Sequence, residues 1–124
     1  MVTENQARAI ALSMPEAEEK SHFAHPDFRV RNKIFATLWP DGRTSVLKLG
    51  REVLMDLLAQ DRATFSIAPG GERGGWTAVD LTRVDPDQYR SLMIQSWRLT
   101  TPKSLLATEA GVRPDAKQRS ARKA

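Results

Sequence analysis

Between Phe28 and Leu49 the sequence alternates apolar and polar residues in three short runs that are separated by tight turns. Asn32-Lys33 predicts the first turn, and Asp41-Gly42 is a strong signal for a two-residue hairpin. Alternation with a period of two is typical of strands that bury one face. Short strands joined by such turns pair in antiparallel order. This segment therefore predicts an antiparallel sheet that packs against helices on one face.

Helical periodicity appears on both sides of these strands. Thr3 and Gln6 have the form of a capping box at the start of a helix over residues 3–13, and a proline ends that helix. Asp85 is a fitting cap for a later helix, because Pro86 follows it and proline is favoured at the first helical position. Both patterns predict helices that turn an apolar stripe towards the sheet.

The remaining segments complete the predicted fold. Residues 15–26 are polar and predict a loop. The elements expected after the three strands are a helix over residues 51–60, strands over 64–68 and 76–81, the helix from Pro86, and a short last helix over 102–108. The predicted fold class is α+β, with two layers in the order α-β-β-β-α-β-β-α. Its antiparallel sheet has about five strands and carries helices on one face.

The formal net charge of +4 comes entirely from the end of the chain. Beyond residue 109 there are five basic side chains and one acidic one, whereas residues 1–109 hold 14 of each sign. We expect residues 1–109 to form one α+β domain and residues 110–124 to be a disordered basic tail. Such a tail suits attraction to polyanions and suits equally well a terminus that only aids solubility.

Several functional classes are excluded by what the sequence lacks. It contains no cysteine, which excludes disulfides, thiolate metal sites and cysteine nucleophiles. The first residues do not resemble a signal peptide, and no apolar run approaches the roughly 18 to 20 residues of a membrane span. We therefore expect a cytoplasmic protein that makes no use of a membrane.

No motif predicts catalysis. His22, His25 and Asp27 lie close together in the sequence, but a metal site needs further ligands and a rigid placement. The glycines of residues 70–75 lack the spacing of a phosphate-binding loop. We expect no enzyme activity, no metal and no other cofactor.

The run from Phe28 to Arg51 is locally basic, with six arginine and lysine residues against one acidic residue. If Phe28 and Val30 face the core, the arginines beside them point to the uncovered sheet face. Lys48 joins them, because its flanking leucines point inward. Cations arranged in this way neutralise DNA phosphates. The candidate phosphate contacts are Arg29, Arg31, Lys33, Arg43 and Lys48, with Arg51 and Arg73 at the margin. The alternative is a solvated face whose cations pair with Glu52, Asp80 or Asp85.

The three tryptophans also allow two interpretations. Trp39, Trp76 and Trp97 are candidates for stacking on bases beside these cations, although packing in a core is the default role of large aromatic side chains. Helical spacing places Trp97 in the core. As an alternative to DNA binding, a cleft near Phe23, Trp76 and Trp97 would suit a protein partner or a small ligand.

Five separated motifs resemble the MmcQ/YjbR family. They are Met14-Pro15-Glu16, FAHPDF at 23–28, VRNKIFATL at 30–38, Gly74-Gly75-Trp76 and Ser96-Trp97-Arg98-Leu99. The resemblance extends from the first helix to about Leu99. It implies a two-layer α+β fold with an open sheet face, which has been likened to double-winged DNA-binding domains. It also implies DNA binding and offers no catalytic residues. DNA is therefore the first expected partner, and a protein partner is the alternative.

Overall fold

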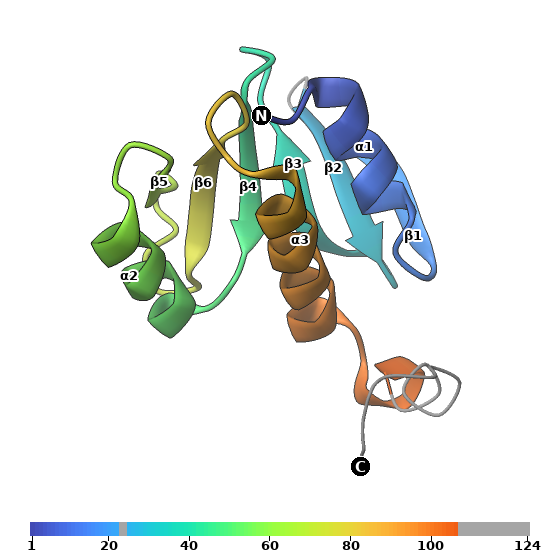
Figure 1. Cartoon of the computed structure of the whole chain (residues 1–124). Helices are drawn as coiled ribbons and strands as arrows, with labels where there is room; N and C mark the ends of the chain where they lie inside the picture. The colour runs from blue at the N-terminus through green and yellow to red at the C-terminus, as the bar shows by residue number, and fades with distance from the viewer. Residues whose placement is uncertain (23–24, 107–124) are drawn as a thin grey trace.

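The computed structural model describes residues 1–22 and 25–106. The elements of these residues are α1 (Glu4–Leu12), β1 (Ala17–His22), β2 (His25–Val30), β3 (Lys33–Leu38), β4 (Thr44–Lys48), α2 (Arg51–Gln60), β5 (Phe65–Ile67), β6 (Trp76–Asp80) and α3 (Pro86–Thr100). The strands form an antiparallel sheet in the order β1-β2-β3-β4-β6-β5 (Figure 1). A further helical turn covers residues 103–106.

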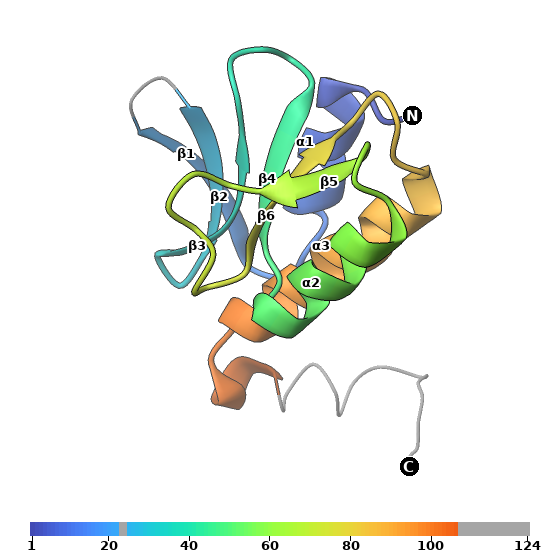
Figure 2. The ribbon, with the colours of Figure 1, turned by 90° about the vertical axis from the view of Figure 1, so that its left-hand side faces the viewer.

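The helices α1, α2 and α3 lie on one side of the sheet, as Figure 2 shows. The main apolar core fills the space between the two layers. It combines Ala7 and Ile10 of α1, Leu54 and Leu57 of α2, and Met93 and Trp97 of α3 with sheet residues such as Phe28, Leu47 and Val79. The predicted α+β class, with helices on one face of an antiparallel sheet, is confirmed.

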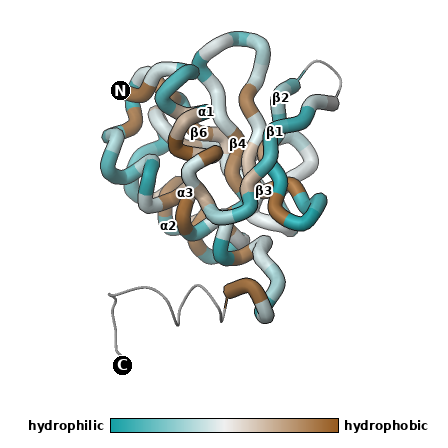
Figure 3. The backbone as a smooth tube through the Cα atoms, turned by 90° about the vertical axis from the view of Figure 1, so that its right-hand side faces the viewer, coloured by the Kyte–Doolittle hydropathy of each residue, from teal (hydrophilic) through white to brown (hydrophobic). Residues whose placement is uncertain are grey.

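The sheet has six strands, one more than predicted, because residues 17–22 form β1 and not a loop. β1 pairs with β2 along its whole length, from Ala17 opposite Val30 to His22 opposite His25. Its sequence, AEEKSH, is mainly hydrophilic (Figure 3) and has no apolar alternation to reveal a strand. β1 forms because the free edge of β2 offers backbone hydrogen-bonding groups. The sequence of β1 alone therefore does not predict a strand.

The turn between β2 and β3 lies one residue earlier than predicted. Arg31 and Asn32 have φ angles of 51° and 67°, and both central residues of a type I′ hairpin turn need such positive values. β3 therefore begins at Lys33. Arg31 is thereby removed from the strand face on which the sequence pattern had placed it beside Arg29.

β2 begins at His25, three residues before the strand predicted from Phe28 and within the predicted loop. The remaining predicted helices and strands agree with the structure to within about one residue. In the capping box, Thr3 Oγ1 accepts from the Gln6 N–H at 3.1 Å and Gln6 Oε1 accepts from the Thr3 N–H at 2.9 Å. Asp85 accepts from the Gln88 N–H at 3.0 Å and caps α3. The end of the predicted last helix and the predicted tail over 110–124 lie outside the described residues.

A buried serine of α3 joins the helix layer to the centre of the sheet. The β3–β4 ladder runs from Leu38 opposite Ser45 to Ala36 opposite Leu47, so the next pair would be Phe35 and Lys48. There the Ser96 hydroxyl donates to the Phe35 carbonyl oxygen at 2.5 Å and accepts from the Lys48 N–H at 3.0 Å. The serine hydroxyl therefore takes the place of a strand-to-strand hydrogen bond.

Removing this hydroxyl should weaken the fold. Ser96→Ala leaves a buried carbonyl and a partly buried N–H without their partner, which costs about 1 to 3 kcal/mol for a buried polar group. Ser91→Ala, on the exposed side of the same helix, is the matched control and should change the free energy of unfolding by less than about 0.5 kcal/mol. Urea unfolding of both variants measures the difference, and equal stabilities would contradict the role given to Ser96.

Gly75 lies at the closest approach between the start of β6 and the end of β4. Its φ is +69°, and a Cβ built on it would lie 1.9 Å from the carbonyl carbon of Gly50. Its carbonyl oxygen accepts from the Leu49 N–H at 3.1 Å. Only glycine both adopts this left-handed backbone conformation without strain and leaves room for the backbone of Gly50.

Gly75→Ala should therefore be much more destabilising than an alanine at a comparable open turn. Gly70 has nearly the same φ of +70° and nothing within 4 Å of the position that an alanine methyl group would take, so Gly70→Ala is the matched control. Gly70→Ala should lower the free energy of unfolding by about 1 to 2 kcal/mol, because alanine is strained in the left-handed backbone conformation. Gly75→Ala should cost about 1 to 3 kcal/mol more through overpacking. Urea unfolding tests this, and similar losses for the two variants would show that the close contact with Gly50 relaxes freely.

Candidate binding site on the uncovered sheet face

A second, smaller apolar cluster lies on the sheet face away from the helices. Val46 of β4 pairs with Ala78 of β6, and together with Ala68 they form this cluster. Trp39 and Trp76 are partly buried and pack against it. The face therefore offers two half-exposed aromatic side chains on a small apolar floor.

The connection between β5 and β6 folds beside this floor and borders an open, shallow cavity. The Ala68 N–H donates to the Trp76 carbonyl at 3.0 Å, and the Trp76 N–H donates to the Gly71 carbonyl at 2.9 Å. These bonds hold the connection in a narrow loop. The cavity has a volume of about 480 Å³, and its lining includes both tryptophans, Val46 and Ala68, with His25 and Thr37 as polar members.

Lys48 lies on the same face, as the alternation in β4 predicted. It is directly opposite Trp76 in the β4–β6 register, and its Nζ is 5.9 Å from the centroid of the Trp76 ring. This is the geometry of a cation–π contact. A cation and an aromatic ring are thus held together beside the cavity.

A second cavity of about 370 Å³ adjoins the first, and both are lined by Trp39 and Pro69. The lining of the second cavity includes Arg43 and Arg62. Arg43 Nη2 lies 2.6 Å from Asp80 Oδ2, but the arginine side chain keeps 56% of its surface exposed. This cavity is therefore more polar than its neighbour.

The predicted phosphate contacts are spread over the molecule. Arg29 lies on the uncovered face and donates to both carboxylate oxygens of Asp27, at 2.7 Å and 3.2 Å. The Asp27 side chain has no exposed surface. Their spacing of two residues on one strand places both on the same face, so the signal for this pair was already present in the sequence.

Three further arginines of the basic run also have carboxylate neighbours. Arg31 Nε is 2.6 Å from Glu16 Oε1, and the Arg51 guanidinium is 4.0 Å from Glu72. The third pair is that of Arg43 with Asp80, a partner that the alternative interpretation named. The local charge of the basic run is therefore largely compensated by acidic residues from elsewhere in the chain.

The remaining two predicted contacts, Lys33 and Arg73, are exposed and belong to different segments of the fold. Lys33 begins β3 beside the β2–β3 turn, whereas Arg73 lies in the β5–β6 connection. Arg43 follows the other end of β3, which at about 3.3 Å per residue is roughly 15 to 20 Å from Lys33. The seven cations do not form one continuous group.

The predicted alternative cleft is divided by the sheet. Trp97 is 3% exposed in the main core, and its indole N–H donates to the Pro15 carbonyl at 2.9 Å. Trp76 lies on the opposite face, so the two tryptophans do not line one cleft. Phe23 lies outside the described residues. The cavity is instead lined by Trp39 and Trp76. In the sequence, an apolar site on this face was indicated by Val46, an apolar residue on the same face as Lys48.

The described residues contain neither a cluster of metal ligands nor a helix that could span a membrane. Across residues 1–22 and 25–106, no group of three or more His, Cys, Asp or Glu side chains is placed to hold a metal ion. No helix in these ranges is long and apolar enough to cross a membrane.

Comparison with known proteins identifies the family of this chain. A family model described as YjbR matches residues 12–99. The chain belongs to the YjbR family. This YjbR chain is also similar to the crystal structure of Deinococcus radiodurans protein DR2400, which carries the family-model domain DUF419. The two are 20% identical over 96% of this chain and 97% of that chain, with a TM-score of 0.72, which shows a shared fold. No curated protein matches the chain.

The YjbR motifs mostly hold the layers together. Ser96 joins α3 to the sheet, and Trp97 joins the same helix to Pro15 of the first motif. Gly75 packs against the backbone of Gly50. Trp76, next in that motif, reaches the uncovered face, as do His25 and Thr37 of two other motifs.

Asp80 links this site to acid stability. Burial opposes ionisation of its carboxyl, but hydrogen bonds from Thr82 and Arg43 outweigh burial and lower its pKa below the ordinary value of 3.8. A carboxyl with a lowered pKa stabilises the fold above its ordinary pKa, and this stabilisation is lost as the pH falls. We expect Asp80→Asn to be less stable than the unsubstituted protein at pH 7, with a difference that shrinks below about pH 4.

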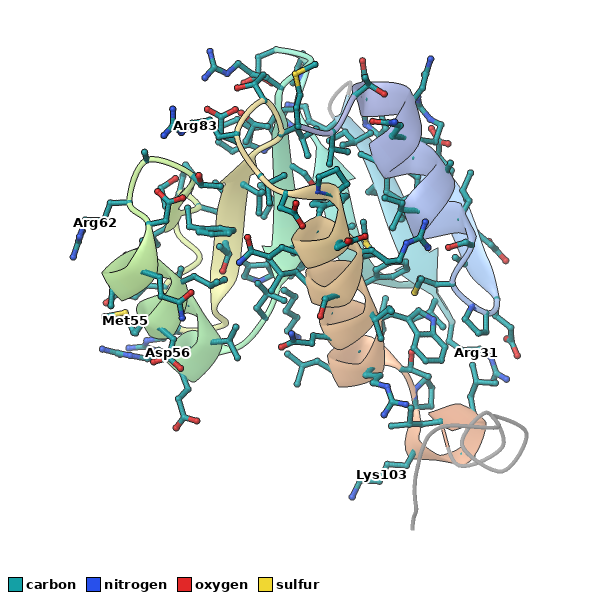
Figure 4. The ribbon with its side chains drawn as sticks, in the orientation of Figure 1. Arg31, Met55, Asp56, Arg62, Arg83 and Lys103 are labelled. Atoms are coloured by element: carbon teal, nitrogen blue, oxygen red, sulfur yellow. The ribbon has the colours of Figure 1, made fainter. Side chains whose placement is uncertain are left out.

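Urea midpoints at pH 7 and pH 3 measure this effect. Asp56→Asn, exposed on α2 (Figure 4), is the matched control and should change little at either pH. A deficit of Asp80→Asn that stays constant between the two pH values would show that the loss does not come from the carboxylate charge.

Proposed function

We propose that this YjbR-family protein binds DNA through the uncovered face of its sheet, and that it prefers single strands. One observation carries the proposal: Lys48 lies over Trp76 beside the cavity that Trp39 completes. Proteins that bind single strands combine aromatic side chains, on which bases stack, with cations that follow the backbone. The pairing of these two chemistries on one exposed face supports the same use here.

The charges of the face favour single strands over duplexes. Affinity for a duplex depends mainly on the number of phosphates that lysine and arginine neutralise. Four of the predicted contacts, Arg29, Arg31, Arg43 and Arg51, already have carboxylate neighbours. Stacking of a base on an aromatic ring contributes about 1 to 3 kcal/mol without any net charge. Unpaired bases therefore gain most from this surface.

The remaining predicted contacts keep supporting roles in the proposal. Lys48 and Arg73 would meet phosphates beside Trp76, and Lys33 would add to the general attraction. In the double-winged arrangement that the family resemblance implies, the β3–β4 turn with Arg43 would flank the bound strand as a wing. The proposal places the protein in the cytoplasm and assigns it no catalytic step.

A second candidate function is a module for a small ligand or a protein partner. It is favoured by the lining of the open, tryptophan-lined cavity, which is mostly apolar with His25 and Thr37 as polar members, because small-molecule sites are lined largely by apolar and aromatic side chains with a few polar groups. This candidate predicts binding of a planar compound without any affinity for DNA.

Fluorescence anisotropy with a labelled oligothymidylate and a duplex of equal length tests the proposal. We expect tighter binding of the single strand at both low and moderate salt. Trp76→Ala should weaken it by about 1 to 3 kcal/mol through lost stacking. Lys48→Met should reduce the salt dependence by about one phosphate contact. Lys103→Met, an exposed lysine beyond α3, is the matched control and should change neither quantity.

The basic residues beyond residue 109 need a separate variant, because they attract any polyanion. Replacing all five by glutamine in the full chain should lower the affinity for single strands and duplexes alike while leaving the effect of Trp76→Ala intact. Binding that disappears in this variant and ignores both Trp76→Ala and Lys48→Met would contradict the proposed surface. Absence of DNA binding together with binding of a planar compound would favour the second candidate.

A further inference from the structure

The two cavities of the uncovered face adjoin each other and differ in chemistry. Trp39 and Pro69 line both, so a molecule that fills one cavity meets the other directly. The larger cavity has tryptophan and small apolar side chains in its lining and no charged arginine, lysine, aspartate or glutamate. The smaller cavity has two arginines, Arg43 and Arg62, and one carboxylate, Asp80. One cavity suits a planar ring, and the other suits an anion.

The two arginines are carried on turns that aspartates hold rigid. Asp41 accepts from the N–H groups of Arg43 and Thr44, each at 2.9 Å, and from the Thr44 hydroxyl at 2.6 Å. Asp61, next to Arg62, accepts from the Ala63 N–H at 3.1 Å. Asp61 also accepts a hydrogen bond from the Thr64 hydroxyl at 2.6 Å. Rigid turns lower the cost of placing a guanidinium against a ligand.

The carboxylate in the smaller cavity leaves donors for an anion. Asp80 engages Arg43 through one nitrogen, Nη2, and a guanidinium has five N–H donors in all. Asp80 also accepts from the N–H and the hydroxyl of Thr82, at 2.9 Å and 2.6 Å. Arg62 adds a second positive charge. The lining of this cavity thus holds two arginines and one carboxylate, with Asp41 and Asp61 in the turns beside them. Arginine is the side chain best suited to bind phosphate with paired hydrogen bonds.

We propose that the two cavities together form a site for one unpaired nucleotide, with the base in the Trp39–Trp76 cavity and its phosphate in the Arg43–Arg62 cavity. This inference rests on the proposed function, because it names one unpaired nucleotide as the part of DNA that the uncovered sheet face binds. A base within a duplex is closed to such a cavity unless it is flipped out. A free nucleotide and a nucleotide within a single strand have the same chemistry, and the test separates them.

The probes are thymidine, thymidine 5′-monophosphate and a thymidine oligomer, each titrated by calorimetry into the full chain. Arg62→Ala should weaken binding of the monophosphate about tenfold or more, because it removes a charge-assisted contact, and should leave thymidine unchanged. Trp76→Ala should weaken both. Arg62 is exposed at the α2–β5 turn, so its replacement leaves the core intact.

The control is Arg31→Ala, another exposed and turn-borne arginine, which Figure 4 shows on the far side of the molecule from Arg62. It should change the binding of neither thymidine nor thymidine 5′-monophosphate. Equal losses for Arg31→Ala and Arg62→Ala would overturn the site, as would thymidine binding that ignores Trp76→Ala.

The failure of this site and the failure of DNA binding give different results. In one case the oligomer binds and Trp76→Ala weakens its binding, but Arg62→Ala does not weaken it and the monophosphate does not displace it. The nucleotide site is then wrong, and the DNA-binding proposal stands. If the monophosphate binds with the expected Arg62 dependence and the oligomer does not bind, the site stands for a free nucleotide and the DNA-binding proposal is wrong.

Discussion

The buried hydroxyl of Ser96 fixes the position of α3 on the centre of the sheet, within the apolar core that joins the two layers. It bonds to Phe35 of β3 and to Lys48 of β4, so one side chain of α3 holds two central strands at the point where their own ladder stops. Because the hydroxyl both donates and accepts, α3 cannot shift along the sheet without breaking both bonds. The position of α3 along the sheet is thereby fixed at this point.

The same region sets the geometry of the uncovered face. The Lys48 backbone is held from the helix side by Ser96, while its side chain lies on the other side over Trp76. Gly75 packs on Gly50 and brings the start of β6 against the end of β4, which places Trp76 opposite Lys48. Contacts that stabilise the fold therefore also position the two groups on which the proposed binding depends.

The sequence predicted the parts of this structure that local patterns determine. The caps at Thr3 and Asp85 and the alternation around Val46 and Lys48 each act within a few residues, so helices, strands and the face of Lys48 followed from them. β1 could not be predicted, because a polar strand forms only where a partner edge is present. The alternative interpretation of the sequence named Asp80 among the partners of the basic run, but it could not assign Asp80 to Arg43, because that pair depends on β4 lying beside β6, which no local pattern specifies.

The polar character of β1 has a consequence for association between chains. An open sheet exposes backbone hydrogen-bonding groups at its outer strands, and these can add a strand from another molecule. Here one outer strand carries two glutamates and a lysine, and the other, β5, has three residues. Charged and short edges both discourage growth of the sheet from one molecule into the next. A sheet with one face uncovered by helices can therefore stay accessible to a ligand without becoming a template for aggregation.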